Sequence, residues 1–333
     1  MDSKIISIGE LLTKNGFKRN EAGIYKSGNE GYWSNLDKEK NKRFITLLKR
    51  KSPLEAVREV IPEKEDHIYS VKREAALELL EIEKNDICID YGCMWGVLSV
   101  GLAKRGGIVI AVDQTEDSLV FLNARKIDEG FDNILCVQDD IRKISLENGT
   151  NFAIVNGVLE WVPEFGEIEL INYFGKRNKK KYPNISPKKL QSDFLQRVYD
   201  NLKTNGELLL AIENRYDYKQ FIGGKDPHIN LYFTSFMPRW IANLISKWKL
   251  NRPYVNYLYS FKKLKKLLKS VGFSEVDLYM AYPHYHAPQF ILPYGSSLSM
   301  RRKLWKEKKA SWRLKVLLTF KWFAPSIIAI AKK

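Results

Sequence analysis

The fold is decided by the stretch DICIDYGCMWGVLSVGLAKRGGIVIAVD, residues 86–113. It opens with a short apolar run at 86–91, breaks at Gly92 and Gly96, continues through a helix-like segment and closes on Asp113. Continuous apolar runs of this kind are typical of a parallel sheet whose two faces are both covered by helices. We therefore predict a strand, a glycine-containing loop, a helix and a second parallel strand.

The same alternation of strand and helix patterns continues toward the C-terminus. Strands are predicted at 86–91, 108–113, 133–138, 152–157 and 206–213, and helices at 95–105, 115–129 and 187–203. SEVDLYMAYP then forms a sixth strand and PSIIAIAKK a seventh, which we expect to be antiparallel and in the edge region of the sheet. This order predicts an α/β fold with a doubly wound, Rossmann-like sheet of seven strands and right-handed crossovers.

The pattern also suggests how the chain is divided. Residues 1–66 are polar and aromatic with weak periodicity, so we expect an N-terminal extension or lid. Residues 67–333 form the α/β domain, with insertions at about 214–258 and 283–323 after the fifth and sixth strands.

Composition limits the class of protein. The formal net charge of +16 predicts attraction to anions, although lysine spread over every solvated face would give the same total. The three cysteines form no C-x-x-C pair and the histidines show no metal-ligand spacing, so we expect neither disulfides nor a bound metal. The N-terminus lacks a signal-peptide pattern, and no apolar run reaches the roughly 18 residues of a membrane span. A cytoplasmic protein is expected.

The loop after the first strand has the chemistry of a nucleoside site. Gly92 lets the backbone turn tightly and approach a ligand, and the following helix presents free N–H groups. Asp113 ends the second strand, where an acid can accept hydrogen bonds from a ribose diol. Asp90 adds a negative charge that suits a cofactor with ammonium and sulfonium groups better than one with a pyrophosphate.

At this point residues 70–282 resemble the class I S-adenosylmethionine-dependent methyltransferases, whose first motif commonly reads D-x-G-C-G-x-G. Here Met94 replaces the central glycine. VQDDIRKI resembles the third-strand segment whose acid contacts adenine, and FAIVNGVLEWVPEF resembles the fourth-strand motif beside cofactor and acceptor. The cofactor-binding residues implied by the resemblance are Asp90, Gly92, Cys93, Gly96, Asp113, Gln114, Asp140, Ile141 and Asn156.

A narrower resemblance concerns the acceptor. LKTNGELLLAIENRYDYKQFIGGKDPH, residues 202–228, is similar to the fifth-strand region of methyltransferases of bacterial cell-surface polysaccharide and O-antigen biosynthesis, although Asn205 replaces a glycine of the turn. The resemblance implies O-methylation of a sugar, a nucleotide-sugar or a lipid-linked glycan. Because an alcohol must lose its proton as the new bond forms, a general base is expected. We assign His228 as the base, with Glu213 and Glu160 as positioning or alternative acids; His228 could also simply occupy a polar turn.

Residues 301–323 are strongly basic with interleaved aromatic side chains. Such a segment can lie on an anionic membrane at the inner face, follow a phosphate backbone, or pack as a solvated helix. Two further functions therefore stay open: an RNA methyltransferase, and a catalytically silent adaptor that keeps the cofactor fold. NGVLEWV lacks the prolines of the segment with which many base-methylating enzymes grip a flipped base, which argues against nucleic acid as the acceptor.

Overall fold

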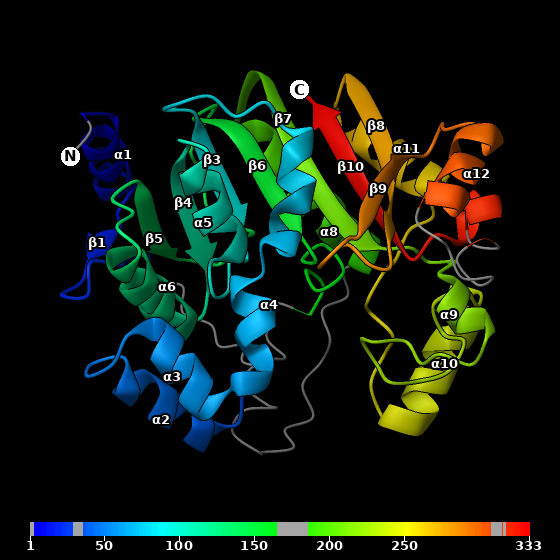
Figure 1. Cartoon of the computed structure of the whole chain (residues 1–333), viewed down its shortest axis with the longest axis horizontal. Coiled ribbons are helices and arrows are strands. Elements are labelled where there is room, and N and C mark those ends of the chain that lie inside the picture. The colour runs from blue at the N-terminus through cyan, green and yellow to red at the C-terminus, as the bar shows by residue number, and fades with distance from the viewer. Residues whose placement is uncertain (1–2, 29–35, 165–185, 308–314, 316–317) are drawn as a thin grey trace.

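The computed structural model describes residues 3–28, 36–164, 186–307, 315 and 318–333. Its centre is one mixed sheet of ten strands in the order β1-β2-β5-β4-β3-β6-β7-β10-β8-β9 (Figure 1). The strands are β1 Lys18–Arg19, β2 Tyr25–Lys26, β3 Ile87–Tyr91, β4 Ile108–Asp113, β5 Ile134–Gln138, β6 Thr150–Asn156, β7 Leu202–Glu213, β8 Glu275–Tyr282, β9 Phe290–Pro293 and β10 Ser326–Lys332.

Helices surround this sheet. They are α1 Ser3–Lys14, α2 Lys38–Leu47, α3 Pro53–Val60, α4 Glu65–Tyr69, α5 Val97–Lys104, α6 Glu116–Asp128, α8 Pro187–Asn201, α9 Tyr218–Phe221, α10 Arg239–Leu250, α11 Phe261–Val271 and α12 Leu298–Glu307. Short 3₁₀ helices are η1 Pro62–Lys64, η2 Val71–Leu79 and η3 Lys321–Phe323. Among the residues that the structure describes, no helix is both long and apolar enough to cross a bilayer.

The strand count corrects the prediction. The seven expected strands form the middle of the sheet, from β5 to β8, but β1 and β2 extend one edge and β9 the other, which makes ten. The two-residue strands β1 and β2 are too short to leave a periodic pattern in the sequence. The final strand, β10, is antiparallel as expected, yet it lies inside the sheet between β7 and β8 rather than in its edge region.

Side chains that alternate along the central strands build two apolar layers. In β3, Ile89 packs into the layer that includes α1, α8 and α11, whereas Cys88 packs into the layer under η2, α5 and α6. This double coverage explains why the strands read as continuous apolar runs.

The predicted N-terminal extension is integrated with this core. The strand β2 pairs in parallel with β5, and α2 and α3 pack on α6 through a separate apolar cluster. Phe44 stacks on Phe121 of α6 with ring centroids 5.3 Å apart, and Trp95 of the glycine-containing loop joins the same cluster. The N-terminal helices therefore support one wall of that loop.

The order of the sheet places a site. The chain moves outward from β3 to β4 and β5 on one side, and then from β6 to β7 on the other. Ligands in open α/β sheets bind beyond the carboxyl ends of the strands where the order reverses. That point lies between β3 and β6, next to the end of β4.

Candidate active site

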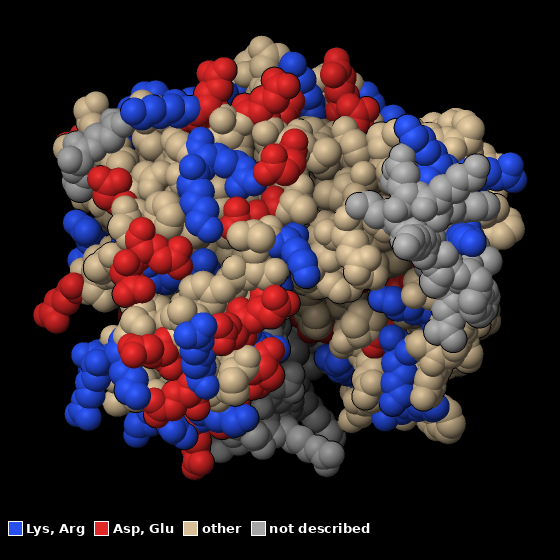
Figure 2. Space-filling view, viewed as in Figure 1, with Lys and Arg blue, Asp and Glu red and all other residues tan. Residues whose placement is uncertain are grey.

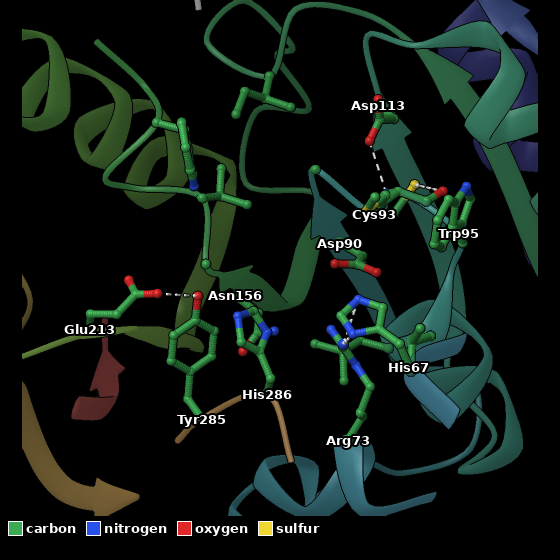
Figure 3. Close-up of a pocket in the computed structure, with 18 of the residues that line it drawn as sticks. His67, Arg73, Asp90, Cys93, Trp95, Asp113, Asn156, Glu213, Tyr285 and His286 are labelled. Carbon is green, nitrogen blue, oxygen red and sulfur yellow. Dashed lines mark hydrogen bonds between the residues drawn. The ribbon is translucent and has the colours of Figure 1, made fainter. Parts of the chain in front are cut away.

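A pocket lies at this reversal point, and Figure 3 shows side chains entering it from several directions. The loop after β3 and the end of β4 form one side, and residues after β6, β7 and β8 form the other. Its wall includes seven of the nine predicted cofactor residues: Asp90, Gly92, Cys93, Asp113, Gln114, Ile141 and Asn156. The sequence motifs, which are spread over 67 positions from Asp90 to Asn156, therefore meet at one place.

The loop after β3 is held in a left-handed conformation at three positions. Gly92 has φ 70°, Met94 φ 49° and Gly96 φ 72°. Met94, which stands where the family motif has glycine, adopts the positive φ as a non-glycine residue, so the replacement changes the side chain without losing the turn. A Cβ on Gly96 would lie 2.1 Å from Cδ1 of Leu122, so a larger residue at this position would force the Leu122 side chain to move.

Asp113 ties this loop to β4. Its Oδ2 accepts a hydrogen bond from the Met94 N–H at 2.9 Å, and its Oδ1 accepts one from the Thr115 N–H at 2.8 Å. Burial raises the pKa of Asp113 above its ordinary value, although the backbone donors oppose that shift. The acid at the end of the second strand thus shapes the pocket as well as lining it.

Asp90 lies between the loop and the histidines in Figure 3. The Ser99 hydroxyl donates to its Oδ2 at 2.6 Å, and burial raises the pKa of Asp90 to about 6. A carboxylate in this position is desolvated, so a cationic ligand that entered the pocket would gain from contact with it.

Two predicted cofactor residues do not line the pocket. Gly96 is absent from its wall and acts through the backbone turn. Asp140 instead forms a bidentate pair with Arg142, with Nε to Oδ1 at 2.9 Å and Nη2 to Oδ2 at 2.7 Å. The neighbouring Ile141 is the residue of this segment that reaches the wall.

The three predicted catalytic residues come together at the far side of the pocket, where Glu213 and His228 line the wall and the fully buried Glu160 lies beside them without reaching it. Nε2 of His228 lies 3.7 Å from Oε2 of Glu213 and 4.0 Å from Oε1 of Glu160. Nδ1 of His228 is 3.0 Å from Oδ1 of Asp226, a residue that sequence reasoning did not assign. Asp226 stands two positions before His228 in KDPH, and this spacing is the only signal that could have found it.

The charges in this cluster are strongly coupled. Burial alone would lower the pKa of His228, but its hydrogen bond to Asp226 and the carboxyl groups of Glu160 and Glu213 raise that pKa well above the ordinary value. Burial, together with Glu160, raises the pKa of Glu213 to about 8. The cluster therefore shares its protons between several groups near neutral pH.

A third group of residues was missed by sequence reasoning. His67, Arg73, Tyr285 and His286 line the pocket from α4, η2 and the segment after β8, outside every recognised motif. Burial and the charge of Arg73 lower the pKa of His67 to about 4 and that of His286 to about 3. Because these imidazoles stay neutral, Arg73 supplies the positive charge of this wall.

Comparison with known proteins identifies distant neighbours. No family model matches the chain, and no curated protein does. Among solved structures, the chain is similar to phosphoethanolamine N-methyltransferase 2 of Haemonchus contortus in complex with S-adenosyl-L-methionine, with a TM-score of 0.49, 13% identity, and coverage of 87% of this chain and 60% of that one. A second structure of that enzyme, with phosphomonomethylethanolamine and S-adenosylhomocysteine, has a TM-score of 0.46 and 13% identity and covers 79% and 52%.

A Listeria monocytogenes protein described as an S-adenosylmethionine-dependent methyltransferase has a TM-score of 0.46 and 14% identity, with coverage of 80% of this chain and 98% of that one. The chain spans 52% and 60% of the length of the two Haemonchus chains. These similarities are distant, so the assignment of an α/β fold rests on the strand order of the sheet itself.

Proposed function

We propose that the protein is an S-adenosylmethionine-dependent methyltransferase that O-methylates a sugar or a glycan precursor of a cell-surface polysaccharide. The observation that carries the proposal is the pocket at the reversal point of the sheet. One side of the pocket has a desolvated acid, a tight glycine turn and a strand-end acid, and the other has Glu213 and His228, with Glu160 buried next to His228.

The residues present fit this cofactor. The cofactor supplies an electrophilic methyl group on sulfur, and the protein aligns and desolvates it. Asp90 provides a carboxylate for the cationic part, Asp113 one for the ribose hydroxyls, and Arg73 a guanidinium for the amino-acid carboxylate. These complementary charges match an S-adenosylmethionine molecule, which has two positive groups and one negative group.

In this proposal an acceptor hydroxyl loses its proton at the cluster of Glu160, Glu213 and His228. Trp161 covers His228, with ring centroids 4.9 Å apart, and Tyr285 donates to Oε1 of Glu213 at 3.3 Å. A hydroxyl held beside these groups can pass its proton to the cluster, with His228 as the proposed base. If His228→Ala leaves methyl transfer unchanged while cofactor binding is intact, this assignment is rejected.

The acceptor class is proposed from the resemblance of residues 202–228. The test is mass spectrometry of cell-surface glycans from cells with and without the protein. We expect one methyl group, a mass of about 14 Da, to be missing from a glycan when the protein is removed. Identical glycans, together with methyl incorporation into RNA by the purified protein, would favour the RNA methyltransferase instead.

The proposed contact of residues 301–323 with an anionic inner membrane surface falls largely outside the described side chains. Of the five aromatic residues in this segment, the structure describes the side chains of Phe320, Trp322 and Phe323. Trp322 is 49% exposed, and this contact stays a prediction. A catalytically silent adaptor is a weaker candidate, since an intact pocket would then have no use; absence of cofactor binding by calorimetry would support it.

A further inference from the structure

We propose that Glu160, Glu213 and His228 bind a divalent first-row transition-metal ion, which holds and acidifies the acceptor hydroxyl. The sequence predicted no metal, because the three ligands lie at positions far apart in the chain. The inference rests on the proposed function, and it changes the role of His228 from base to ligand.

The geometry gathers one ligand atom from each residue. One carboxylate oxygen of Glu160, one of Glu213 and a ring nitrogen of His228 all lie within 4.8 Å of one another. The measured separations are 3.7 Å between Nε2 and Oε2 of Glu213, and 4.0 Å between Nε2 and Oε1 of Glu160. Two ligands at about 2.1 Å from an ion stand roughly 3 Å apart in octahedral geometry, so small side-chain movements would close this set around a cation.

Three of the four carboxylate oxygens of Glu160 and Glu213 have no hydrogen-bond partner among the described residues; the fourth, Oε1 of Glu213, accepts from Tyr285. Glu160 is 0% exposed, and neither of its side-chain oxygens has a hydrogen-bond partner among the described residues. Oε2 of Glu213 is likewise buried without such a partner. A buried carboxylate without partners is costly, and native proteins supply either hydrogen bonds or a metal in that situation.

The histidine is oriented as a metal ligand would be. Asp226 Oδ1 lies 3.0 Å from Nδ1, which turns Nε2 toward the two glutamates. Asp226 is itself held by the Tyr254 hydroxyl at 2.8 Å and the Thr234 hydroxyl at 3.2 Å, both at Oδ2. Histidine ligands usually bond a carboxylate through their second nitrogen, which fixes the tautomer and the direction of the ring.

The donor set indicates the kind of ion. Imidazole favours transition ions such as Zn²⁺ and Fe²⁺, and carboxylates also accept Mn²⁺, whereas Mg²⁺ prefers oxygen ligands. Three protein ligands leave an open position for the acceptor oxygen. The bound hydroxyl loses its proton to Glu213 as the O–H bond breaks. The O–CH₃ bond then forms while the S–CH₃ bond breaks, and that electron pair stays on sulfur to give S-adenosylhomocysteine.

The test uses full-length protein stripped with a chelator, then titrated with Zn²⁺ by calorimetry and with Mn²⁺ by electron paramagnetic resonance. We expect one ion per chain, at least tenfold weaker binding in Glu160→Gln, and about 10–100-fold weaker binding in Asp226→Asn. Asp193→Asn is the control: Asp193 is an exposed acid of α8 paired with Lys189 away from the cluster, and its loss should leave metal affinity unchanged.

Binding of S-adenosylmethionine distinguishes failure of the metal proposal from failure of the proposed function. The metal proposal is overturned if the stripped wild type binds S-adenosylmethionine but neither ion, or if Glu160→Gln binds the metal as well as wild type. The cluster of Glu160, Glu213 and His228 would then be held together by shared protons and not by an ion. If no cofactor binds, the proposed function itself has failed. Methyl transfer that stops with the chelator and returns with the ion supports the proposal.

A different observation supports a second proposal, on the exposed face of α10. Trp240, Leu244 and Trp248 follow one another at intervals of four residues and are 71%, 62% and 79% exposed. Residues four apart share one side of a helix, so these side chains form a continuous apolar stripe, which we call the Trp240 face. Exposed apolar stripes of this kind mark contact with a partner or a membrane.

We infer that the Trp240 face docks on an anionic lipid surface. The helix contains no acidic residue, and its Lys247 and Lys249 are exposed, whereas Arg239 is turned inward and donates to the carbonyls of Asn256 and Leu258. Figure 2 shows its part of the surface as mostly tan and blue, and Figure 1 places α10 beyond the carboxyl end of β7, the end at which the pocket lies. Tryptophan beside basic residues is typical of helices that lie in the membrane interface.

Vesicle co-sedimentation tests this docking. We expect binding to vesicles of phosphatidylglycerol and phosphatidylcholine, loss of most binding with added salt, and at least a tenfold loss in the Trp240→Ser/Trp248→Ser variant. Ile127→Ser is the control, because Ile127 is a 70% exposed apolar residue of α6, outside both proposed membrane contacts, and its replacement should leave vesicle binding unchanged. Unchanged binding in the double variant, or a dimer that only this variant abolishes, would overturn the proposal.

Discussion

Single residues in the pocket hold charge where burial opposes it. Asp90, Asp113 and Glu213 all have pKa values raised by burial, so each ionised carboxylate costs folding free energy. Buried groups with displaced pKa values concentrate at functional sites, where stability is exchanged for binding. The first two predictions test this exchange at the cofactor side of the pocket.

Replacing Asp90 with Asn should stabilise the cofactor-free protein. The pKa of Asp90 rises from 3.8 to about 6 on folding, so the folded protein favours the protonated carboxyl group. Between pH 3.8 and about 6 this group loses its proton, and its contribution to the free energy of unfolding is lost. At pH 7 we expect Asp90→Asn to raise the free energy of unfolding by about 1–3 kcal/mol and to weaken cofactor binding at least tenfold. Urea unfolding and calorimetry measure the two effects; a destabilised variant with normal affinity would contradict this role.

Arg73 should recognise the cofactor's carboxylate. We expect Arg73→Ala to weaken binding of S-adenosylmethionine about 10–100-fold, because a charge-assisted contact is lost. Binding of decarboxylated S-adenosylmethionine should stay unchanged, because that ligand has no carboxylate for Arg73 to bind. Arg142→Ala is the matched control, since Arg142 pairs with Asp140 outside the pocket wall. Equal loss for both ligands in a calorimetric titration would show that Arg73 serves another purpose.

At the scale of elements, the sequence predicts those helices and strands whose own residues show a clear apolar pattern. Strands β3 to β7 are apolar on both faces, and the helices between them alternate with these runs, so sequence periodicity located them within a few residues. The strands β1 and β2 have two residues each, so only their pairing defines them. The position of β10 inside the sheet depends on partners on both sides, which no local pattern encodes.

The loop after β3 gives the third prediction. Gly96 and Gly130 both have positive φ, at 72° and 76°, but an added Cβ would meet Leu122 at 2.1 Å in the first and nothing within 4 Å in the second. Gly130→Ala therefore reports the backbone strain alone, at about 1 kcal/mol. Gly96→Ala adds the clash, so we expect it to lower the free energy of unfolding by at least about 1 kcal/mol more. If Gly96→Ala and Gly130→Ala lower the free energy of unfolding equally in urea, Leu122 of α6 moves away from the added methyl group at little cost.

At the scale of the whole molecule, the sequence located the cofactor side of the site better than its acceptor side. Gly92 and Asp113 sit at fixed places relative to the strands, so the motif predicted their meeting. Glu160, Glu213 and His228 meet only because the chain returns from α9 toward the carboxyl ends of β6 and β7. Arg73 comes from a 3₁₀ helix with no motif at all, and only the packed structure brings it to the wall.

The coupled cluster predicts how overall stability depends on pH. On folding, the pKa of Glu213 rises from 4.5 to about 8, and that of His228 also rises, so both groups stabilise the protein most at low pH and lose this contribution as pH increases. We expect Glu213→Gln to flatten the fall in the free energy of unfolding between pH 5 and pH 8. If the free energy of unfolding falls equally with pH in the variant and in wild type, groups other than Glu213 cause the pH dependence.

The central claim is that the pocket between β3, β4 and β6 binds S-adenosylmethionine, and calorimetric titration of the purified protein tests it most directly. We predict one molecule bound per chain, with affinity reduced at least tenfold in Asp113→Ala and unchanged in the surface control Asp132→Ala. Absence of binding by folded wild-type protein, or equal affinity in Asp113→Ala, would contradict the account.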